Sequence, residues 1–172
     1  MPPIPMRLST RYKHIHATES YSVVFVLDIR TATPHFPGIG RYVAGLVPAL
    51  AAQLADGERL ALVCNDATQV ASFSHILSSN TAVSTFRIKA TPFSLSQQWQ
   101  IVRLLRRLSI GQGTQIYHSP YYLMPYWPGA PTVLTIHDLI PILLPDTVSL
   151  RARLFFRLTH RLALRSADRI IA

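Results

Sequence analysis

The chain has one cysteine, Cys64, among its 172 residues. This excludes an internal disulfide framework and a cysteine-based metal site. Cys64 ends the apolar stretch "LALVC", so we expect a buried thiol in a reducing compartment. No stretch approaches 18 consecutive apolar residues, and the first residues lack the apolar core of a signal peptide. The sequence therefore favours a cytoplasmic protein, with peripheral attachment to the inner face of a membrane as an open alternative.

Acidic residues are also scarce. The chain has 8 Asp and Glu against 17 Lys and Arg, which gives a net charge of +9. This balance favours an anionic partner, such as nucleotide phosphates, nucleic acid or an anionic membrane surface. No RNA-recognition or zinc-finger signature occurs, so we do not expect nucleic acid. Hydrophobic residues make up 49% of the chain, enough for one domain with a substantial core after a flexible basic leader at 1–21.

Several catalytic motifs are missing from the sequence. It contains no G-x-x-x-x-G-K-[ST] P-loop, no H-E-x-x-H zinc motif and no G-x-S-x-G nucleophile elbow. Its seven histidines are scattered, so we predict no metal site. The candidate sites therefore depend on less specific patterns.

Short apolar runs alternate with stretches of helical spacing. "VVFVLD" at 23–28 ends in an acid and is typical of a parallel strand covered on both faces. The spacing predicts further strands at 60–64, 83–89, 115–119, 132–136 and in the final "RIIA", and helices at 40–55, 67–77, from 94 or 96 to 108, and 150–165. Asp66 is expected to cap the second helix. This alternation predicts an α/β, Rossmann-like three-layer domain with a mostly parallel sheet.

Three motifs follow predicted strand ends, where open α/β sheets bind their ligands. The first, "PHFPGIGRY", places Gly38 and Gly40 at a helix start. Glycine lets the backbone approach a ligand, and a helix N-terminus offers N–H groups to an anion. The motif is not G-x-G-x-x-G, because Val43 takes the last position. An ordinary turn that needs positive φ is the alternative interpretation.

The second and third motifs follow the fourth and fifth strands. "YHSPYYLMPYWPG" contains His118, Tyr121 and Tyr122 in a proline-stiffened loop, which suits a sugar ring or a base. Packing of these aromatics on the sheet edge is the alternative. His137 can take up or donate a proton, and Asp138 can orient a loop. Alternatively, His137 is a satisfied core histidine and Asp138 caps a turn. Convergence of three motifs on one sheet edge favours a ligand site.

The predicted helix 150–165 carries arginines and leucines at the same four-residue spacing. They are Arg153, Arg157, Arg161 and Arg165, and Leu150, Leu154, Leu158 and Leu162. We expect the leucines to pack on the domain beneath a solvated arginine face. Contact of this Arg-rich helix with a membrane surface, or with another domain, is the alternative.

Three segments in order carry a resemblance to a known family. "PGIGRYVAGLVPALAAQL", "IYHSPYYLMPYWPGAPTVLTIHDLIPILLPD" and "RLTHRLALRSADRIIA" resemble the N-terminal domain of retaining glycosyltransferases of the GT-B fold, in the group-1 family (family 4), especially its mannosyltransferase-like members. The likeness implies one half of a GT-B fold, an acceptor-side domain at 22–172. The family's C-terminal donor domain is absent from the chain, so the resemblance implies that the chain alone is inactive.

The resemblance also implies roles for the candidate residues. Gly38, with Gly40 beside it, would approach the donor diphosphate; His137 would lie near the transferred sugar, with Asp138 continuing its motif. The acceptor or cleft residues would be Arg41, Tyr42, His118, Tyr121 and Tyr122. The implied reaction moves a sugar, with mannose the family-level expectation, from a nucleotide-sugar to a glycan or lipid-linked acceptor with retention. No metal or other cofactor is implied. A non-catalytic, flavodoxin-like anion-binding module and a half-domain that assembles with a separate partner are the alternatives.

Overall fold

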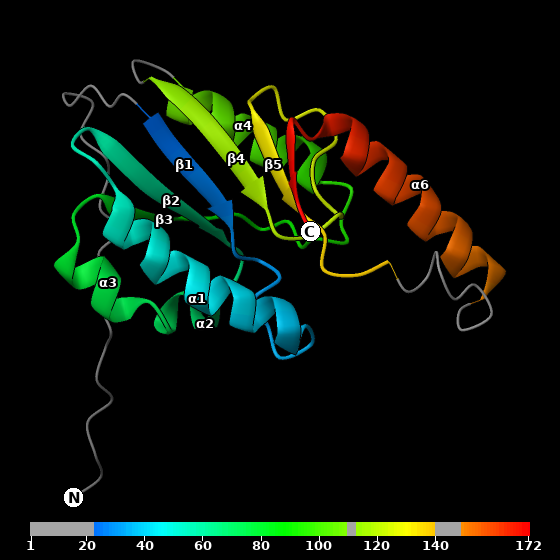
Figure 1. Ribbon diagram of the computed structural model, residues 1–172, viewed down its shortest axis with the longest axis horizontal. Helices are drawn as coiled ribbons and strands as arrows, with labels where there is room; N and C mark the ends of the chain where they lie inside the picture. The colour runs from blue at the N-terminus through cyan, green and yellow to red at the C-terminus, as the bar shows by residue number, and fades with distance from the viewer. Residues whose placement is uncertain (1–22, 110–112, 140–148) are drawn as a thin grey trace, which may run out of the picture.

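The computed structural model describes residues 23–109, 113–139 and 149–172. Within them the strands form a six-stranded sheet in the order β3-β2-β1-β4-β5-β6, and every neighbouring pair is parallel (Figure 1). The strands are β1 (Val23–Asp28), β2 (Glu58–Cys64), β3 (Val83–Arg87), β4 (Thr114–Ser119), β5 (Thr132–Thr135) and β6 (Arg169–Ile171). The strand order reverses direction between β1 and β4, which is where open α/β sheets place a ligand crevice.

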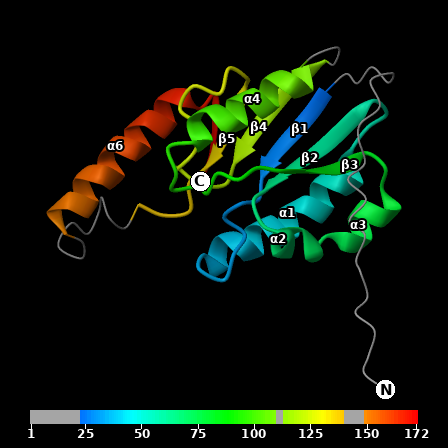
Figure 2. The same cartoon turned by 180° about the vertical axis from the view of Figure 1, so that it is seen from behind.

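Helices cover both faces of this sheet (Figures 1 and 2). They are α1 (Pro37–Gln53), α2 (Ala67–Ala71), α3 (Ser74–Ser79), α4 (Gln97–Ser109) and α6 (Leu150–Ser166). Helices α1 to α3 pack with one set of strand side chains, including Leu27 and Leu62. The alternate side chains, including Val26 and Val63, pack under α4 and α6. Burial on both faces explains the continuous apolar runs of the strands, and the predicted three-layer Rossmann-like fold is confirmed.

Helix α1 begins three residues before the predicted start. Pro37 occupies its first turn, where the preset φ of proline suits a helix start. Gly38 and Gly40 therefore lie inside the first turn. Positive φ angles among the described residues occur at Gly57 and Gly129. The alternative that Gly38 and Gly40 serve a positive-φ turn is thus wrong.

The helix predicted at 67–77 is divided into α2 and α3. Asp66 caps α2 as expected: its side chain accepts a hydrogen bond from the backbone N–H of Thr68, and Gln69 completes a capping box. The division comes at Phe73, whose backbone leaves helical geometry (φ −110, ψ 11) while its side chain is buried in the core. Cys64 is buried, as predicted, and burial raises the pKa of its thiol.

Helix α6 packs on the domain through a different face from the one we expected. Its buried side chains are Phe156, Thr159, His160 and Ala163. Leu150, Leu154 and Leu158 are exposed instead, so the prediction that these leucines pack on the domain is wrong. The buried positions recur every three or four residues and form one stripe, which places the three leucines on the opposite side of the helix.

Candidate functional site

The carboxyl ends of β1, β4 and β5 meet at one edge of the sheet, because all three strands are parallel neighbours. Helix α1 starts at this edge, directly after the loop that follows β1 (Figure 1). One turn beyond Gly38, Tyr42 hydrogen-bonds Thr135 at the end of β5, with 3.1 Å between the hydroxyl oxygens. Its ring also meets that of His137 edge-on, with centroids 5.0 Å apart. The predicted glycine and histidine motifs therefore lie on the same edge.

Thr135 joins two candidate residues through its hydroxyl. It bonds Tyr42, and it also bonds Nε2 of His118 on β4 at 2.9 Å. Thr135 is itself buried. Sequence reasoning did not single it out, although a polar residue at the end of an otherwise apolar strand is a usable signal. The three side chains fix α1, β4 and β5 relative to one another directly beneath the edge.

His118 is held in its neutral form. Burial lowers the pKa of its imidazole to about 4, and the electrostatic effect of the nearby His137 acts in the same direction. A neutral His118 can exchange a hydrogen bond with Thr135 at physiological pH without carrying charge. It therefore suits a positioning role better than proton transfer near neutral pH.

Acid should destabilise the domain through His118. The unfolded side chain binds a proton near pH 6.5, whereas the folded one resists protonation until about pH 4. We therefore expect the free energy of unfolding to fall by roughly 2–3 kcal/mol between about pH 7 and about pH 4.5. His118→Gln, which retains a polar group near the position of Nε2, should remove most of this fall in urea-unfolding experiments. His160, whose pKa is also lowered by burial, should leave a remainder. An unchanged pH dependence in His118→Gln would contradict the assignment.

His137 is exposed at the edge, so the alternative that it is a core histidine is wrong. Its Nε2 lies 3.1 Å from the carbonyl oxygen of Pro120. A carbonyl only accepts hydrogen bonds, so Nε2 must carry a proton. In the neutral ring, Nδ1 is then the basic nitrogen. This contact fixes both the tautomer and the direction of the imidazole.

Asp138 is exposed beside the aromatic residues of the same edge. Its negative charge contributes to raising the pKa of Tyr121 and of Tyr122, in both cases after the larger effect of burial. It also opposes the lowering of the His160 pKa by burial. Asp138 therefore lies close enough to act electrostatically on the two tyrosines, as a smaller effect than their burial.

An array of aromatic rings extends along the edge. Tyr121 lies 5.2 Å from Phe36 and 4.4 Å from Tyr122, between ring centroids, and its hydroxyl donates to that of Tyr122 at 3.2 Å. Tyr122 continues to His160, 3.9 Å away. Phe93 stacks on Phe36 while leaving 61% of its surface exposed. Tyr122 is half-buried and packs against the core. Tyr121 is also half-buried, and its ring contacts those of Phe36, Phe93 and Tyr122.

The first turn of α1 is open to a ligand. A Cβ built at Gly38 would meet no atom of the described chain within 4 Å, and one at Gly40 would make only an ordinary contact with Thr33. Phe36, at the N-cap, gives this turn no side-chain hydrogen bond, and the turn contains no acidic residue. Arg41 is exposed directly after it. Pro37 has no N–H and the N–H of Gly40 donates to the carbonyl of Phe36, so the helix dipole and the N–H groups of Gly38 and Ile39 are available to an anion.

A buried polar network lies beneath this edge, and sequence reasoning missed it. Asp28, the acid that ends β1, has a carboxylate that accepts two hydrogen bonds from the Arg30 guanidinium, at 2.8 and 2.6 Å. The hydroxyl of Tyr117 donates to the same carboxylate at 2.8 Å. Arg30 also donates to the carbonyl of Ala90 and the amide oxygen of Gln97. The network ties the loop after β1 to the start of α4.

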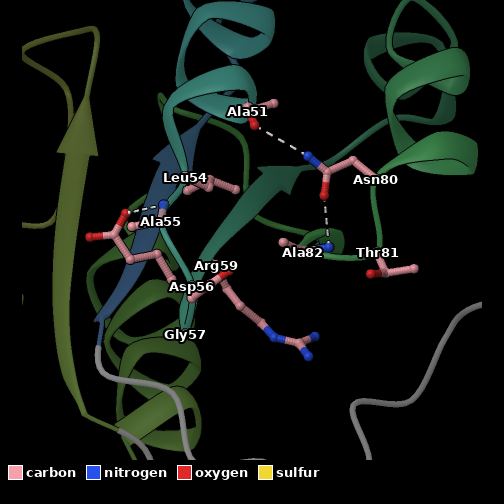
Figure 3. Close-up of a pocket in the computed structure, with 10 residues that line it drawn as sticks. Ala51, Leu54, Ala55, Asp56, Gly57, Arg59, Asn80, Thr81 and Ala82 are labelled. Atoms are coloured by element: carbon pink, nitrogen blue, oxygen red, sulfur yellow. Dashed lines mark hydrogen bonds between the residues drawn. The ribbon is translucent and has the colours of Figure 1, made fainter.

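The described residues contain no group of three or more His, Cys, Asp or Glu side chains arranged to hold a metal. A hollow of about 410 Å³ lies at the opposite edge of the sheet, beside the end of α1 (Figure 3). There Asn80 donates to the carbonyl of Ala51 and accepts from the N–H of Ala82, so its amide joins the end of α1 to the turn before β3. A second hollow, about 430 Å³, is lined by Trp127 and the end of α6. None of the predicted site residues lines either hollow.

These features define a Rossmann-like domain with an anion-accessible helix N-terminus at its ligand edge. Residues 36–172 match the family model described as Glycosyltransferase Family 4. That range covers most of the chain and includes all the candidate residues, so the chain belongs to glycosyltransferase family 4. The fold is consistent with one half of a GT-B enzyme. No curated protein gives a significant match to the chain.

Proposed function

We propose that this chain is the acceptor-side domain of a glycosyltransferase that transfers a sugar from a nucleotide-sugar to a glycan or lipid-linked acceptor, with retention of configuration. Membership of family 4 supports sugar transfer as the activity. The observation that carries the site assignment is the contact between Tyr42 on α1 and His137 after β5, because it brings the uncapped helix start and the imidazole to one edge. Mannose is our proposal for the transferred sugar.

The donor diphosphate would bind at the first turn of α1. The nucleoside diphosphate is the leaving group, and it gains negative charge as the bond between the anomeric carbon and the phosphate oxygen breaks. Helix N-terminal N–H groups can stabilise that charge without reorganising. The open space at Gly38 allows oxygen atoms to approach the backbone closely. His137, oriented by Pro120, would then face the sugar or its phosphate, and the adjacent Asp138 would complete that motif. In this proposal the nucleotide-sugar is a substrate and the site needs no metal.

The acceptor would contact the aromatic part of the edge. The half-exposed ring of Tyr121 would stack on the apolar side of a sugar, and its hydroxyl, which donates to Tyr122, would accept a hydrogen bond. Tyr42 and His118, held by Thr135, would support this surface from below. Arg41 is exposed and would add positive charge at the cleft. Such a mixture of ring faces and a few oriented polar groups is typical of small-molecule sites.

A transfer assay with a radiolabelled nucleotide-sugar tests this function. We expect turnover from this chain extended through a family donor domain and none from the 172-residue chain alone, because the donor domain would supply most nucleotide contacts. Product NMR would report whether anomeric configuration is retained. Turnover by the 172-residue chain alone would refute the proposal that the acceptor and the donor bind to separate domains. Failure of the extended protein with every nucleotide-sugar tested would refute glycosyl transfer.

A further inference from the structure

Helix α6 has an apolar face that the domain does not use. Figures 1 and 2 show the helix at one end of the sheet. Its buried stripe includes Phe156 and His160. On the opposite side Leu150, Leu154 and Leu158 are exposed by 68%, 57% and 58%. Their four-residue spacing aligns them along the helix. We call these three leucines the outer leucine row.

Arginines surround the outer leucine row. Arg151, Arg157, Arg161 and Arg165 are all exposed, and the sequence of α6 contains no acidic residue. None of these arginines forms an ion pair within the described part of the chain. Arg161 and Arg165 continue the outward face by one and two turns beyond Leu158. The exposed side of α6 is therefore both apolar and strongly cationic.

A surface of this composition matches one kind of partner. We propose that the outward face of α6 binds an anionic lipid surface and lies in its plane. The outer leucine row would enter the boundary between headgroups and acyl chains, and the arginines would contact lipid phosphates. A second copy of the chain is a poorer occupant, because a symmetric contact would set arginines against arginines. Among the described helices, none combines the length and the hydropathy of a transmembrane span.

Trp127 supports the same orientation. It is 75% exposed and shares a hollow with Leu162 and Arg165, near the end of α6. Tryptophan favours the boundary between lipid and water, because its ring is apolar and its indole N–H is polar. The proposal does not depend on the sugar-transfer function, since it concerns a face of α6 that contributes none of the candidate site residues.

Vesicle co-sedimentation of the full 172-residue chain tests the proposal. We expect binding to equimolar phosphatidylglycerol and phosphatidylcholine vesicles, and little binding to phosphatidylcholine alone. Replacing Arg157, Arg161 and Arg165 by glutamine should weaken binding on the order of 100-fold. The matched control replaces the exposed α4 arginines Arg103, Arg106 and Arg107 by glutamine and should change binding little. This control removes the same charge from a different face.

A second pair of variants tests the apolar contribution. Leu154→Ser should weaken vesicle binding roughly tenfold, whereas Leu95→Ser, at a leucine 80% exposed elsewhere, should not. All variants alter exposed side chains and should keep the wild-type unfolding midpoint, measured by circular dichroism. Absence of vesicle binding, or equal loss from the α4 and α6 arginine variants, would overturn the proposal. Binding that survives Leu154→Ser unchanged would overturn it too, because charge alone would then explain the attraction.

Discussion

Replacing Asp28 by asparagine is expected to lower the free energy of unfolding by about 3–5 kcal/mol. Asp28 and Arg30 form a buried ion pair, with 4% and 2% of their surfaces exposed. Burial alone would lower the pKa of the Arg30 guanidinium, but Asp28 raises it above its ordinary value, so Arg30 stays charged. Asparagine keeps the shape and removes the counter-charge. Urea unfolding monitored by circular dichroism measures the change.

The control for this effect is Asp66→Asn. Asp66 is exposed, and asparagine is also a good N-cap residue, so the same chemical change should alter stability little there. The double variant Asp28→Leu, Arg30→Met should recover part of the loss, because it removes both buried charges together. Equal stability of the Asp28→Asn and Asp66→Asn variants would show that the buried pair is not a main stabilising contact.

The fold was predictable because burial on both faces leaves a strong pattern. All six strands lie at or within two residues of their predicted positions. The pattern is clearest in β1 and in the second half of β2, because these segments are almost wholly apolar and their carboxyl-terminal residues are buried. That Gly38 and His137 lie at the same edge could also be predicted, because the carboxyl ends of parallel strands meet at one edge of a sheet. The split at Phe73 was not predictable from periodicity, because the division reflects one side chain entering the core.

The buried network and the packing face of α6 could not be predicted, because both depend on contacts between residues that are distant in the sequence. Asp28 and Arg30 are two positions apart, but Tyr117 and Gln97, which complete the network, are distant in sequence. On α6, the leucines and the buried stripe have the same helical spacing, so periodicity could not decide which face packs. Phe156 and His160 face the domain and their rings contact Tyr122. Only the tertiary structure brings these rings together.

Gly38→Ala should lower the rate of sugar transfer without lowering the stability of the domain. The open space around Gly38 accommodates a Cβ, and alanine favours a helix, so stability should stay equal or rise by up to about 1 kcal/mol. In the protein extended through a donor domain, the new methyl group would hold the diphosphate away from the first turn of α1. A displacement of about 1 Å can cost on the order of 100-fold in rate. Gly45→Ala is the control, because Gly45 lies further along α1 and also has open space around it.

The ratio of turnover between Gly38→Ala and Gly45→Ala, measured by radiolabelled-sugar transfer in the extended protein, tests most directly whether the start of α1 binds the donor diphosphate. We expect Gly45→Ala to match the wild type and Gly38→Ala to fall about 100-fold below it, with both proteins at least as stable as the wild type. Equal, wild-type turnover in the two variants would contradict a donor site at this helix start.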